Sequence, residues 1–272
     1  MEMLIAGGDR RHELLCELAR ARGWHVMSMG LPGSAPCAGR AQVAVLPMPC
    51  ARAGYIPAPL VERALRLDDI VPHVAGGARV YCGGVCDELR ALASEHGWRI
   101  VDMYSDEAFA RRNALLSAEG AVYAAMRERD AALAGSLCLI VGFGRIGQML
   151  AMQLMGLGAR VRVAARREES RALAQCMGCE AVDTDALELA VGSCGVIFNT
   201  VPARILDERV LLRVDAGALI VETASAPYGV DFDCARALGV RALREGGIPG
   251  RYCPRTAAAV MLDAIESARE EI

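Results

Sequence analysis

A glycine-rich hexapeptide is the segment whose residue types and spacing point most directly to chemistry. Gly142-Phe143-Gly144-Arg145-Ile146-Gly147 lies between a strand-like apolar run, 137–141, and a helical pattern, 146–157. In this context Gly142 permits a tight turn, Gly144 lets the backbone approach a pyrophosphate, and Gly147 lets the helix pack closely on the strand. Free N–H groups at the helix start favour the anion. The motif therefore predicts a dinucleotide site.

The residues after the next predicted strand, 160–164, decide which dinucleotide is bound. An NAD site places an acid about 20 residues after the motif, where it holds the ribose hydroxyls. Small residues, two arginines and a hydroxyl stand here instead: Ala164, Ala165, Arg166, Arg167 and Ser170. Because arginine binds phosphate bidentately and keeps its charge, this segment favours NADP. The alternative is a solvated helix start whose Glu168 and Glu169 favour the helix dipole.

Two polar segments follow later strands of the same half. Ligands of open α/β sheets bind beyond the carboxyl ends of the strands, so we expect both segments to face the nicotinamide and an interdomain cleft. The residues concerned are Asn199, Thr200, Val201 and Pro202 after strand 196–199, and Glu222 and Ser225 at the end of strand 219–222. For Asn199 and Pro202, capping a strand and stiffening a loop are equally good explanations.

Groups able to transfer protons are few. All four histidines (12, 25, 73 and 96) precede the glycine motif, whereas the common two-domain 2-hydroxyacid dehydrogenase places one after the nucleotide fold. That class is therefore disfavoured. The candidate catalytic groups are Asp9, Glu119, Glu222 and Tyr252, with His12 also available, and the sequence does not rank them.

The eleven cysteines indicate reduced thiols in a cytoplasmic protein, since no secretory signal precedes them. Cys82-x-x-x-Cys86 and Cys176-x-x-Cys179 each resemble half of a zinc site, but they fall in different predicted domains and lack neighbouring histidines. We therefore predict neither a metal site nor a disulfide.

Composition sets limits on partners. The chain has 272 residues, 54% of them hydrophobic, which indicates two compact domains. A net charge of -3 without a basic run disfavours nucleic acid. Apolar runs such as 137–141 are far shorter than the roughly 20 residues of a membrane span. The chain has no lysine, which excludes Schiff-base, P-loop and lysine-base chemistry.

Strand and helix patterns alternate along both halves, which predicts parallel sheets covered by helices. The first half has predicted strands at 3–6, 24–27, 43–47, 79–82 and 99–102, helices at 11–22 and 85–96, and an irregular Pro/Gly-rich connection at 31–59. The second half has strands at 137–141, 160–164, 180–182, 196–199, 219–222 and 241–244, with helices at 146–157, 168–177 and 184–191. Two longer helices are predicted at 115–129 and 256–271.

We therefore predict an α/β protein of two domains. Residues 1–115 would form a flavodoxin-like or Rossmann-like α/β domain for substrate and partner. Residues 116–255 would form an NADP-binding Rossmann domain with a doubly wound parallel sheet. The terminal helix, 256–272, is expected to pack back on the first domain.

A set of segments in fixed order resembles the family of dipicolinate synthase A subunits over almost the whole chain. The segments are Gly7-Gly8-Asp9, Asn113 to Gly120, the glycine motif, Asn199 to Pro202, Ala224-Ser225 and Gly247-Ile248-Pro249-Gly250. The last of these, followed by Pro254 and Thr256, is the most specific. Arg255 stands where members often carry lysine, and Glu222 where many carry aspartate, so a role needing a neutral amine at 255 is not carried over.

The resemblance implies NADP-dependent oxidation of dihydrodipicolinate, or of its hydroxytetrahydro precursor, to dipicolinate in a sporulating cell. It also implies a partner, a flavoprotein-like B subunit; a homo-oligomer is left open. A dianionic substrate needs cations, and arginine suits carboxylates. Arg10, Arg251 and Arg255 are the predicted substrate-binding residues.

Two other functions stay open. An NADP-dependent dehydrogenase of the shikimate or methylenetetrahydrofolate type has the same fold, although the missing lysine argues against the usual catalytic lysine of those enzymes. A non-catalytic NADP-binding protein would leave the redox step to its companion. Dipicolinate formation, with and without the companion, separates these functions.

Overall fold

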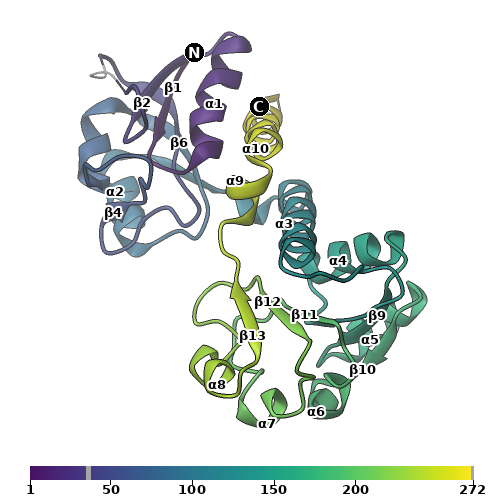
Figure 1. Cartoon of the computed structure of the whole chain (residues 1–272). Coiled ribbons are helices and arrows are strands. Elements are labelled where there is room, and N and C mark those ends of the chain that lie inside the picture. Colours follow the sequence, from purple (N-terminus) through teal and green to yellow (C-terminus); the bar gives the residue numbers. More distant parts are fainter. Residues whose placement is uncertain (35–37, 271–272) are drawn as a thin grey trace. The chain divides into compact units, whose positions relative to one another are not determined.

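The computed structural model describes residues 1–34 and 38–270, which form two compact units. The first comprises Met1–Asn113 and Pro249–Ile272, and the second Ala114–Ile248 (Figure 1). Residues 249–255, which the sequence prediction gave to the nucleotide domain, belong to the first unit because Gly250 lies directly against Asp9 there.

The first unit is built on a five-stranded parallel sheet. Its strand order, β2-β1-β3-β6-β7, is the 2-1-3-4-5 order of flavodoxin-like folds, which confirms the predicted fold class. The strands are Glu2–Ala6 (β1), His25–Met29 (β2), Ala41–Val45 (β3), Val74–Cys82 (β6) and Arg99–Asp102 (β7). The sequence therefore predicted every strand of this sheet, with errors of at most two residues at the ends except for β6, which begins five residues before the predicted strand 79–82.

Successive residues of β1 enter different hydrophobic cores. Met3 and Ile5 lie in a core that also contains residues of α1 (Arg10–Ala21), whereas Leu4 and Ala6 lie in the core that contains residues of α2 (Asp87–His96). Since both faces of the sheet are covered at β1, this strand is a continuous apolar run from Met3 to Ala6.

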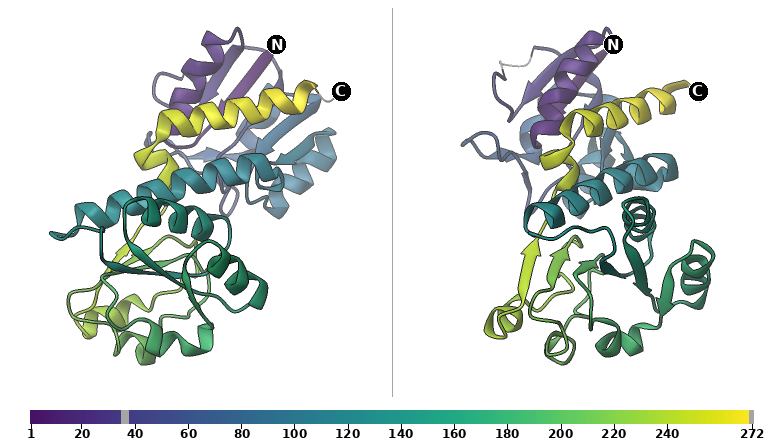
Figure 2. Two further views of the ribbon diagram at one scale, coloured as in Figure 1. Left: turned by 90° about the vertical axis from the view of Figure 1, so that its right-hand side faces the viewer. Right: turned by 45° about the vertical axis from the view of Figure 1, so that its right-hand side comes forward.

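The C-terminal helix α10 (Pro254–Glu270) packs beside α1, and Figure 2 shows the yellow and purple helices side by side in both views. Four of its buried side chains belong to the same core as Met3 and Ile5 of β1; they are Ala258, Met261, Leu262 and Ile265. At the edge, Arg22 Nη1 donates to Glu266 Oε2 at 2.6 Å, and Trp24 Nε1 donates to Glu266 Oε1 at 3.0 Å. The terminal helix is thus part of the first unit's core.

The connection from β3 to β6 covers the sheet with short elements. Strands β4 (Tyr55–Ile56) and β5 (Leu65–Arg66) pair antiparallel, and a 3-10 helix, Leu67–His73, follows. Ile56 and Ile70 are buried in the core beneath them. The sequence predicted only irregular chain over 31–59, because two-residue strands are too short to show a periodicity.

The second unit has a six-stranded parallel sheet in the order β10-β9-β8-β11-β12-β13. This is the 3-2-1-4-5-6 order of the Rossmann fold. The strands are Leu137–Val141 (β8), Arg160–Ala164 (β9), Glu180–Val182 (β10), Val196–Asn199 (β11), Leu219–Glu222 (β12) and Arg241–Arg244 (β13). All six predicted strands are confirmed with the same bounds.

The helices of this unit agree less closely with prediction. They are α4 (Arg145–Gly156), α5 (Glu168–Cys176), a 3-10 turn (Thr184–Ala186), α6 (Leu187–Ala190), α7 (Glu208–Leu211) and α8 (Phe232–Ala237). The predicted helix 184–191 is divided into the 3-10 turn and α6. The sequence missed α7 and α8, which are very short and begin at N-caps Asp207 and Asp231.

Helix α3 (Glu107–Arg127) begins earlier than the predicted 115. Asp106 Oδ1 accepts from the N–H groups of Ala108 and Phe109 at 2.8 and 3.3 Å, which caps the helix start. The boundary between the units falls within this helix. The two remaining elements are a 3-10 turn, Met103–Ser105, and α9 (Ile248–Tyr252). No helix in the described part of the chain is long and apolar enough to cross a membrane.

The burial of α10 predicts that its apolar face stabilises the first unit. We expect Ile265→Ala to lower the free energy of unfolding by about 2–5 kcal/mol, because it leaves a cavity at a fully buried site. Ser267→Ala, at an exposed position of the same helix, serves as the control and should change stability by less than about 0.5 kcal/mol. Urea unfolding followed by circular dichroism measures both. Equal stability of the two variants would contradict this packing.

Candidate dinucleotide site

The glycine motif forms the turn between β8 and α4. Gly142 has φ +91°, which side chains rarely adopt, and a Cβ there would lie 2.5 Å from Thr200 Oγ1. A Cβ on Gly147 would lie 2.4 Å from the Gly142 carbonyl oxygen. The turn and the close packing of helix on strand therefore both require glycine, for the reasons inferred from the sequence.

Gly144 is glycine for a different reason. Its φ of -80° and ψ of -162° suit any residue, and a Cβ there would meet no atom within 4 Å. Gly144 is the N-cap of α4 and supplies no side-chain cap. An uncapped helix start beside open space is a site for an anion, so these residues fit a dinucleotide pyrophosphate.

The loop after β9 contains two arginines whose side chains have no bonding partner among the described residues. Ala164 and Ala165 are buried, whereas Arg166 and Arg167 are exposed, and their guanidinium groups make no hydrogen bond or ion pair with the residues that the structure describes. Ser170 lies partly buried in the first turn of α5. No acid ends β9, so the loop carries positive charge where an NAD site would carry a carboxylate.

Arg171 holds this loop in place. Its Nη1 donates to the carbonyl oxygens of Ala165 and Arg166 at 2.9 and 2.7 Å and contacts Asp183 Oδ2 at 2.5 Å. Sequence reasoning missed Arg171, because a basic residue in the middle of an exposed helix resembles ordinary surface charge. The contact also occupies Asp183, which directly follows β10.

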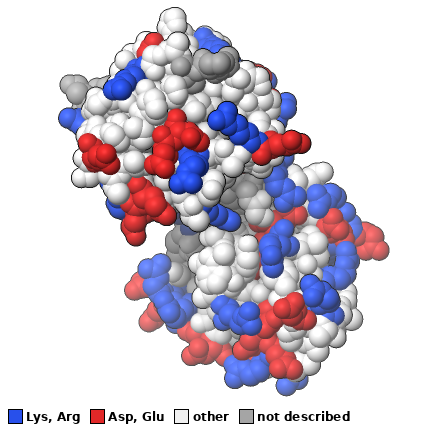
Figure 3. Space-filling view, turned by 90° about the vertical axis from the view of Figure 1, so that its left-hand side faces the viewer, with Lys and Arg blue, Asp and Glu red and all other residues white. Residues whose placement is uncertain are grey.

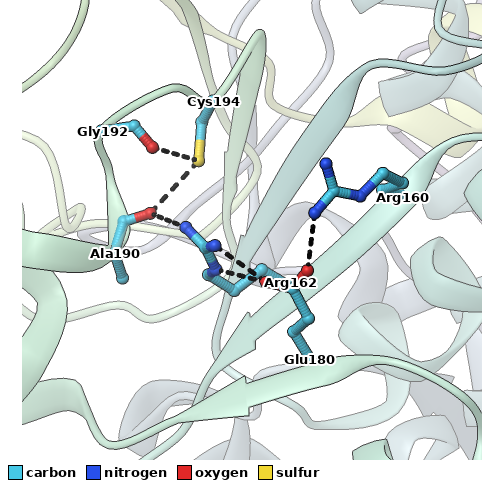
Figure 4. Close-up of polar contacts among 6 residues, drawn as sticks. All are labelled: Arg160, Arg162, Glu180, Ala190, Gly192 and Cys194. Atoms are coloured by element: carbon cyan, nitrogen blue, oxygen red, sulfur yellow. Dashed lines mark hydrogen bonds and ion pairs between the residues drawn. The ribbon is translucent and has the colours of Figure 1, made fainter.

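A second arginine ties β9 to its neighbours at the other end of the strand (Figure 4). Arg162 donates from Nε and Nη2 to Glu180 Oε2 at 3.0 and 2.8 Å, and Arg160 donates to Oε1 at 2.9 Å. Hydrogen bonds from Arg162 and then Arg160 lower the pKa of Glu180. Arg162 also donates to the Ala190 carbonyl oxygen at 2.9 Å. These contacts fix the strand that leads into the loop with Arg166 and Arg167.

Glu222 lies at the end of β12 and is completely buried. Asn199 Nδ2 donates to both carboxylate oxygens at 2.8 and 2.9 Å. Backbone N–H groups supply three more hydrogen bonds, from Ala224 at 2.9 Å, Gly229 at 2.8 Å and Val230 at 2.9 Å. The two residues that the sequence predicted to face the cofactor thus bond to each other, which gives both a positioning role.

The remaining predicted residues after β11 and β12 differ in whether their polar groups already form hydrogen bonds within the protein. Thr200 Oγ1 donates to the Val141 carbonyl oxygen at 3.0 Å. Val201 donates its N–H to Asn199 Oδ1 at 3.2 Å, and its carbonyl oxygen accepts from Asn199 Nδ2 at 3.0 Å. Pro202 and Ser225 are exposed. Among the predicted residues of these two segments, Ser225 therefore has the hydroxyl that a ligand can reach, since the Thr200 hydroxyl is bonded to Val141.

Asp9 and His12 lie together at the start of α1, in the first unit. Arg11 donates to the two Asp9 oxygens at 3.0 and 2.9 Å, and His12 Nδ1 lies 3.5 Å from Oδ1. Burial would raise the pKa of Asp9, but the neighbouring His12 and Arg11 side chains outweigh it and hold that pKa well below its usual range. Burial also lowers the pKa of the fully buried His12, against the opposing effect of Asp9. A carboxylate held this firmly as an anion is a weak general base.

Gly250 completes this cluster. A Cβ at Gly250 would lie 2.1 Å from Asp9 Oδ2, so the residue must be glycine. This contact gives a structural reason for the second glycine of Gly-x-Pro-Gly. The sequence analysis did not predict that Arg11 pairs with Asp9. Its position two residues after an N-cap aspartate could have indicated this pairing.

The predicted substrate-binding arginines all lie in the first unit. The side chain of Arg10 is 61% exposed and pairs with Glu13, and that of Arg255 is 69% exposed and lies 3.8 Å from Glu17. Arg251 stacks on the Tyr252 ring at 5.0 Å. Glu119 is exposed on α3, in the second unit. The catalytic candidates are thus divided between the units, with Asp9 and Tyr252 in one and Glu119 and Glu222 in the other.

The surface carries no large field of one sign on the face drawn in Figure 3, where acidic and basic side chains are interspersed. In the part of the chain that the structure describes, no group of three or more His, Cys, Asp or Glu side chains is arranged to hold a metal ion. The geometry that points to a ligand is therefore the glycine turn and the arginine loop.

Comparison with known families agrees with this geometry. Residues 2–104 match the N-terminal domain of the dipicolinate synthase A subunit. Residues 98–247, more than half of the chain, match the NAD binding domain of D-isomer specific 2-hydroxyacid dehydrogenases. The second match assigns a nicotinamide dinucleotide to the second unit, without distinguishing NAD from NADP.

Individual relatives extend the comparison. The dipicolinate synthase A subunit of Bacillus subtilis (strain 168) is 31% identical over 184 residues, which cover 68% of this chain but only 62% of that relative. The crystal structure of the dipicolinate synthase A subunit from Bacillus halodurans has a TM-score of 0.86 at 23% identity, covering 98% of this chain and 97% of that one. A transhydrogenase from Sinorhizobium meliloti has a TM-score of 0.68 at 15% identity, covering 98% and 94%.

The structural matches show that the fold is shared, and the sequence matches show the family to which the chain belongs. The chain belongs to the family defined by the NAD binding domain of D-isomer specific 2-hydroxyacid dehydrogenases, and its predicted resemblance to the A subunits of dipicolinate synthases is confirmed.

Proposed function

We propose that this chain is the dehydrogenase component of a dipicolinate synthase, and that it oxidises dihydrodipicolinate or its hydroxytetrahydro precursor with NADP. The observation that carries the proposal is the pairing of two features at the carboxyl edge of the second sheet. The uncapped start of α4 lies beside open space at Gly144, and the neighbouring loop presents Arg166 and Arg167 in place of an acid. Together they support a nucleotide with a pyrophosphate and a 2′-phosphate.

The chain's own residues would bind and orient the cofactor. The backbone of Gly142 to Gly147 would hold the pyrophosphate, and Arg166, Arg167 and Ser170 the 2′-phosphate. The Glu222 network keeps the segments after β11 and β12 in place beside it. When bound, the nicotinamide would accept a hydride from the ring of dihydrodipicolinate, and loss of a proton would complete the aromatic product; the hydroxytetrahydro precursor would in addition lose water.

The first unit supplies cations for a dicarboxylate. Arg11 neutralises Asp9, so the start of α1 does not repel a dianion. We propose that Arg10, Arg251 and Arg255 contact the carboxylates. Arg10 begins α1, Arg251 follows the Gly250 that lies against Asp9, and Arg10 and Arg255 are only weakly paired at the surface. Glu119 and Tyr252 are then the proposed proton acceptors, because Asp9 and Glu222 are held by their own units.

A partner follows from the relative's name. A protein named as the A subunit of a synthase has at least one companion, and we propose that the companion of this chain is a flavoprotein-like B subunit. The purified chain with that companion, NADP and dihydrodipicolinate should form dipicolinate and NADPH in equal amounts. Arg251→Gln should weaken substrate binding, while Arg90→Gln, on α2, serves as the exposed control. Full activity without the companion would contradict the partnership, and nucleotide binding without turnover in any mixture would favour a non-catalytic role.

NADP preference is tested by measuring the dissociation constants of NADP and NAD calorimetrically. The wild type should bind NADP more tightly. Arg166→Ala with Arg167→Ala should weaken NADP binding by about 10- to 150-fold or more, because the loss of even one arginine–phosphate interaction removes about 1.5–3 kcal/mol. NAD binding should change little. Arg236→Ala, which removes an equally exposed charge on α8, is the control. Equal affinities of the wild type for the two nucleotides would refute the assignment.

The open space at Gly144 gives a clean test of the pyrophosphate site. Gly144→Val should fold normally, since the backbone there suits any residue and no protein atom lies within 4 Å. It should nevertheless lose nucleotide binding, because the added side chain fills the ligand's place. Gly156→Ala, an equally open glycine of the same helix, should bind normally. Normal nucleotide affinity of Gly144→Val would mean that the motif is only a turn.

A further inference from the structure

Three cysteines gather in the first unit, separate from the glycine motif. Cys50 follows β3, Cys82 ends β6, and Cys86 is the N-cap of α2. Cys50 Sγ lies 3.6 Å from Cys86 Sγ and 3.4 Å from the Gly84 carbonyl oxygen. The sequence pointed to Cys82 and Cys86 only as half of a zinc site, and the structure adds Cys50 as the partner of Cys86.

The backbone holds the two sulfurs close together. The Cys50 N–H donates to the Gly83 carbonyl oxygen at 2.9 Å, which fixes the segment after β3 to the turn after β6. A Cβ at Gly84 would lie 3.4 Å from Pro49, so the two segments are in close contact. A disulfide requires sulfurs about 2.05 Å apart, so the pair must close by roughly 1.5 Å. Backbone contacts already bring the two residues into reach of each other.

The two thiols differ in access and in reactivity. Cys50 is fully buried, whereas Cys86 is partly exposed. A hydrogen bond from Cys82 outweighs burial and lowers the pKa of Cys50 to about 6. Burial raises the pKa of Cys86 to about 11. A solution oxidant therefore reaches Cys86, and Cys50 is the thiolate placed to attack it.

We propose that Cys50 and Cys86 form a reversible disulfide, which makes this cluster a thiol-oxidation site. Cys86, once deprotonated, exchanges with a small disulfide such as glutathione disulfide, releases one glutathione thiolate and becomes a mixed disulfide. The Cys50 thiolate then attacks the Cys86 sulfur and expels the second glutathione. The pair loses two electrons and two protons, and one glutathione disulfide becomes two glutathione thiols.

The chain's composition makes this site convenient to map. Because lysine is absent, trypsin cleaves only at arginine and yields peptide 41–52 with Cys50 and peptide 80–90 with Cys82 and Cys86. The full chain is equilibrated in glutathione buffers of rising oxidised fraction, quenched with acid, alkylated and analysed by mass spectrometry. The wild type and Cys82→Ser should both give a cross-linked 41–52/80–90 pair that disappears on return to reduced glutathione.

Cys86→Ser should abolish the cross-link and leave a folded protein, because its position is partly exposed. Cys50→Ser should do the same, and Cys16→Ser, at a buried position in α1, should retain the cross-link. A cross-link that survives in Cys86→Ser would assign the bond to Cys82 and overturn the proposal. So would its absence from the wild type in fully oxidised buffer, or stoichiometric Zn²⁺ binding that protects all three thiols from alkylation.

Discussion

A buried carboxylate that pairs with no cation among the described residues organises the carboxyl edge of the second sheet. Burying an ionised carboxyl group is costly unless hydrogen bonds replace the lost water. Glu222 meets this requirement with the side chain of Asn199 and three backbone N–H groups. The same bonds hold the ends of β11 and β12 to the loop that returns at Gly229, where a Cβ would lie 2.2 Å from Asn199 Nδ2. The segments that we propose to face a nucleotide are therefore positioned by a network of hydrogen bonds to both carboxylate oxygens.

In the first unit, the carboxylate that follows a strand is stabilised by an arginine side chain. Asp9 also follows a strand at the ligand edge, yet it is compensated by Arg11 and not by backbone alone. The pair cancels charge at the start of α1, and Gly250 allows the carboxylate to lie against α9. In both units the acid nearest the strand ends is thus committed to structure. The residues proposed to meet anionic ligands are arginines, whose guanidinium groups suit carboxylates and phosphates.

Sequence patterns predicted the sheets far better than the interactions between side chains. Strands such as 137–141 are continuous apolar runs, because both faces of a parallel sheet are buried, and a run of that kind is visible in one dimension. The glycine motif could also be recognised from the sequence, since turn geometry and close packing each require glycine at a fixed spacing. The Cys50–Cys86 approach and the Asn199–Glu222 bond join residues far apart in the chain, and no local periodicity records them. Helix α3 was predicted too short because Arg111 and Arg112 interrupt its apolar pattern near its start.

The charged residues around β9 bear on which dinucleotide the second unit can bind. An acid is present near this edge, but it follows β10 and not β9, and Arg171 engages it. That contact neutralises Asp183, and the same guanidinium holds the carbonyl oxygens of Ala165 and Arg166. The loop backbone is thereby fixed while the side chains of Arg166 and Arg167 stay uncommitted among the described residues. Preorganised backbone and unpaired guanidinium groups reduce the cost of ordering the loop around an anion. The arrangement supports the proposed 2′-phosphate at this position, because ribose hydroxyls would need a carboxylate acceptor and Arg171 already contacts Asp183.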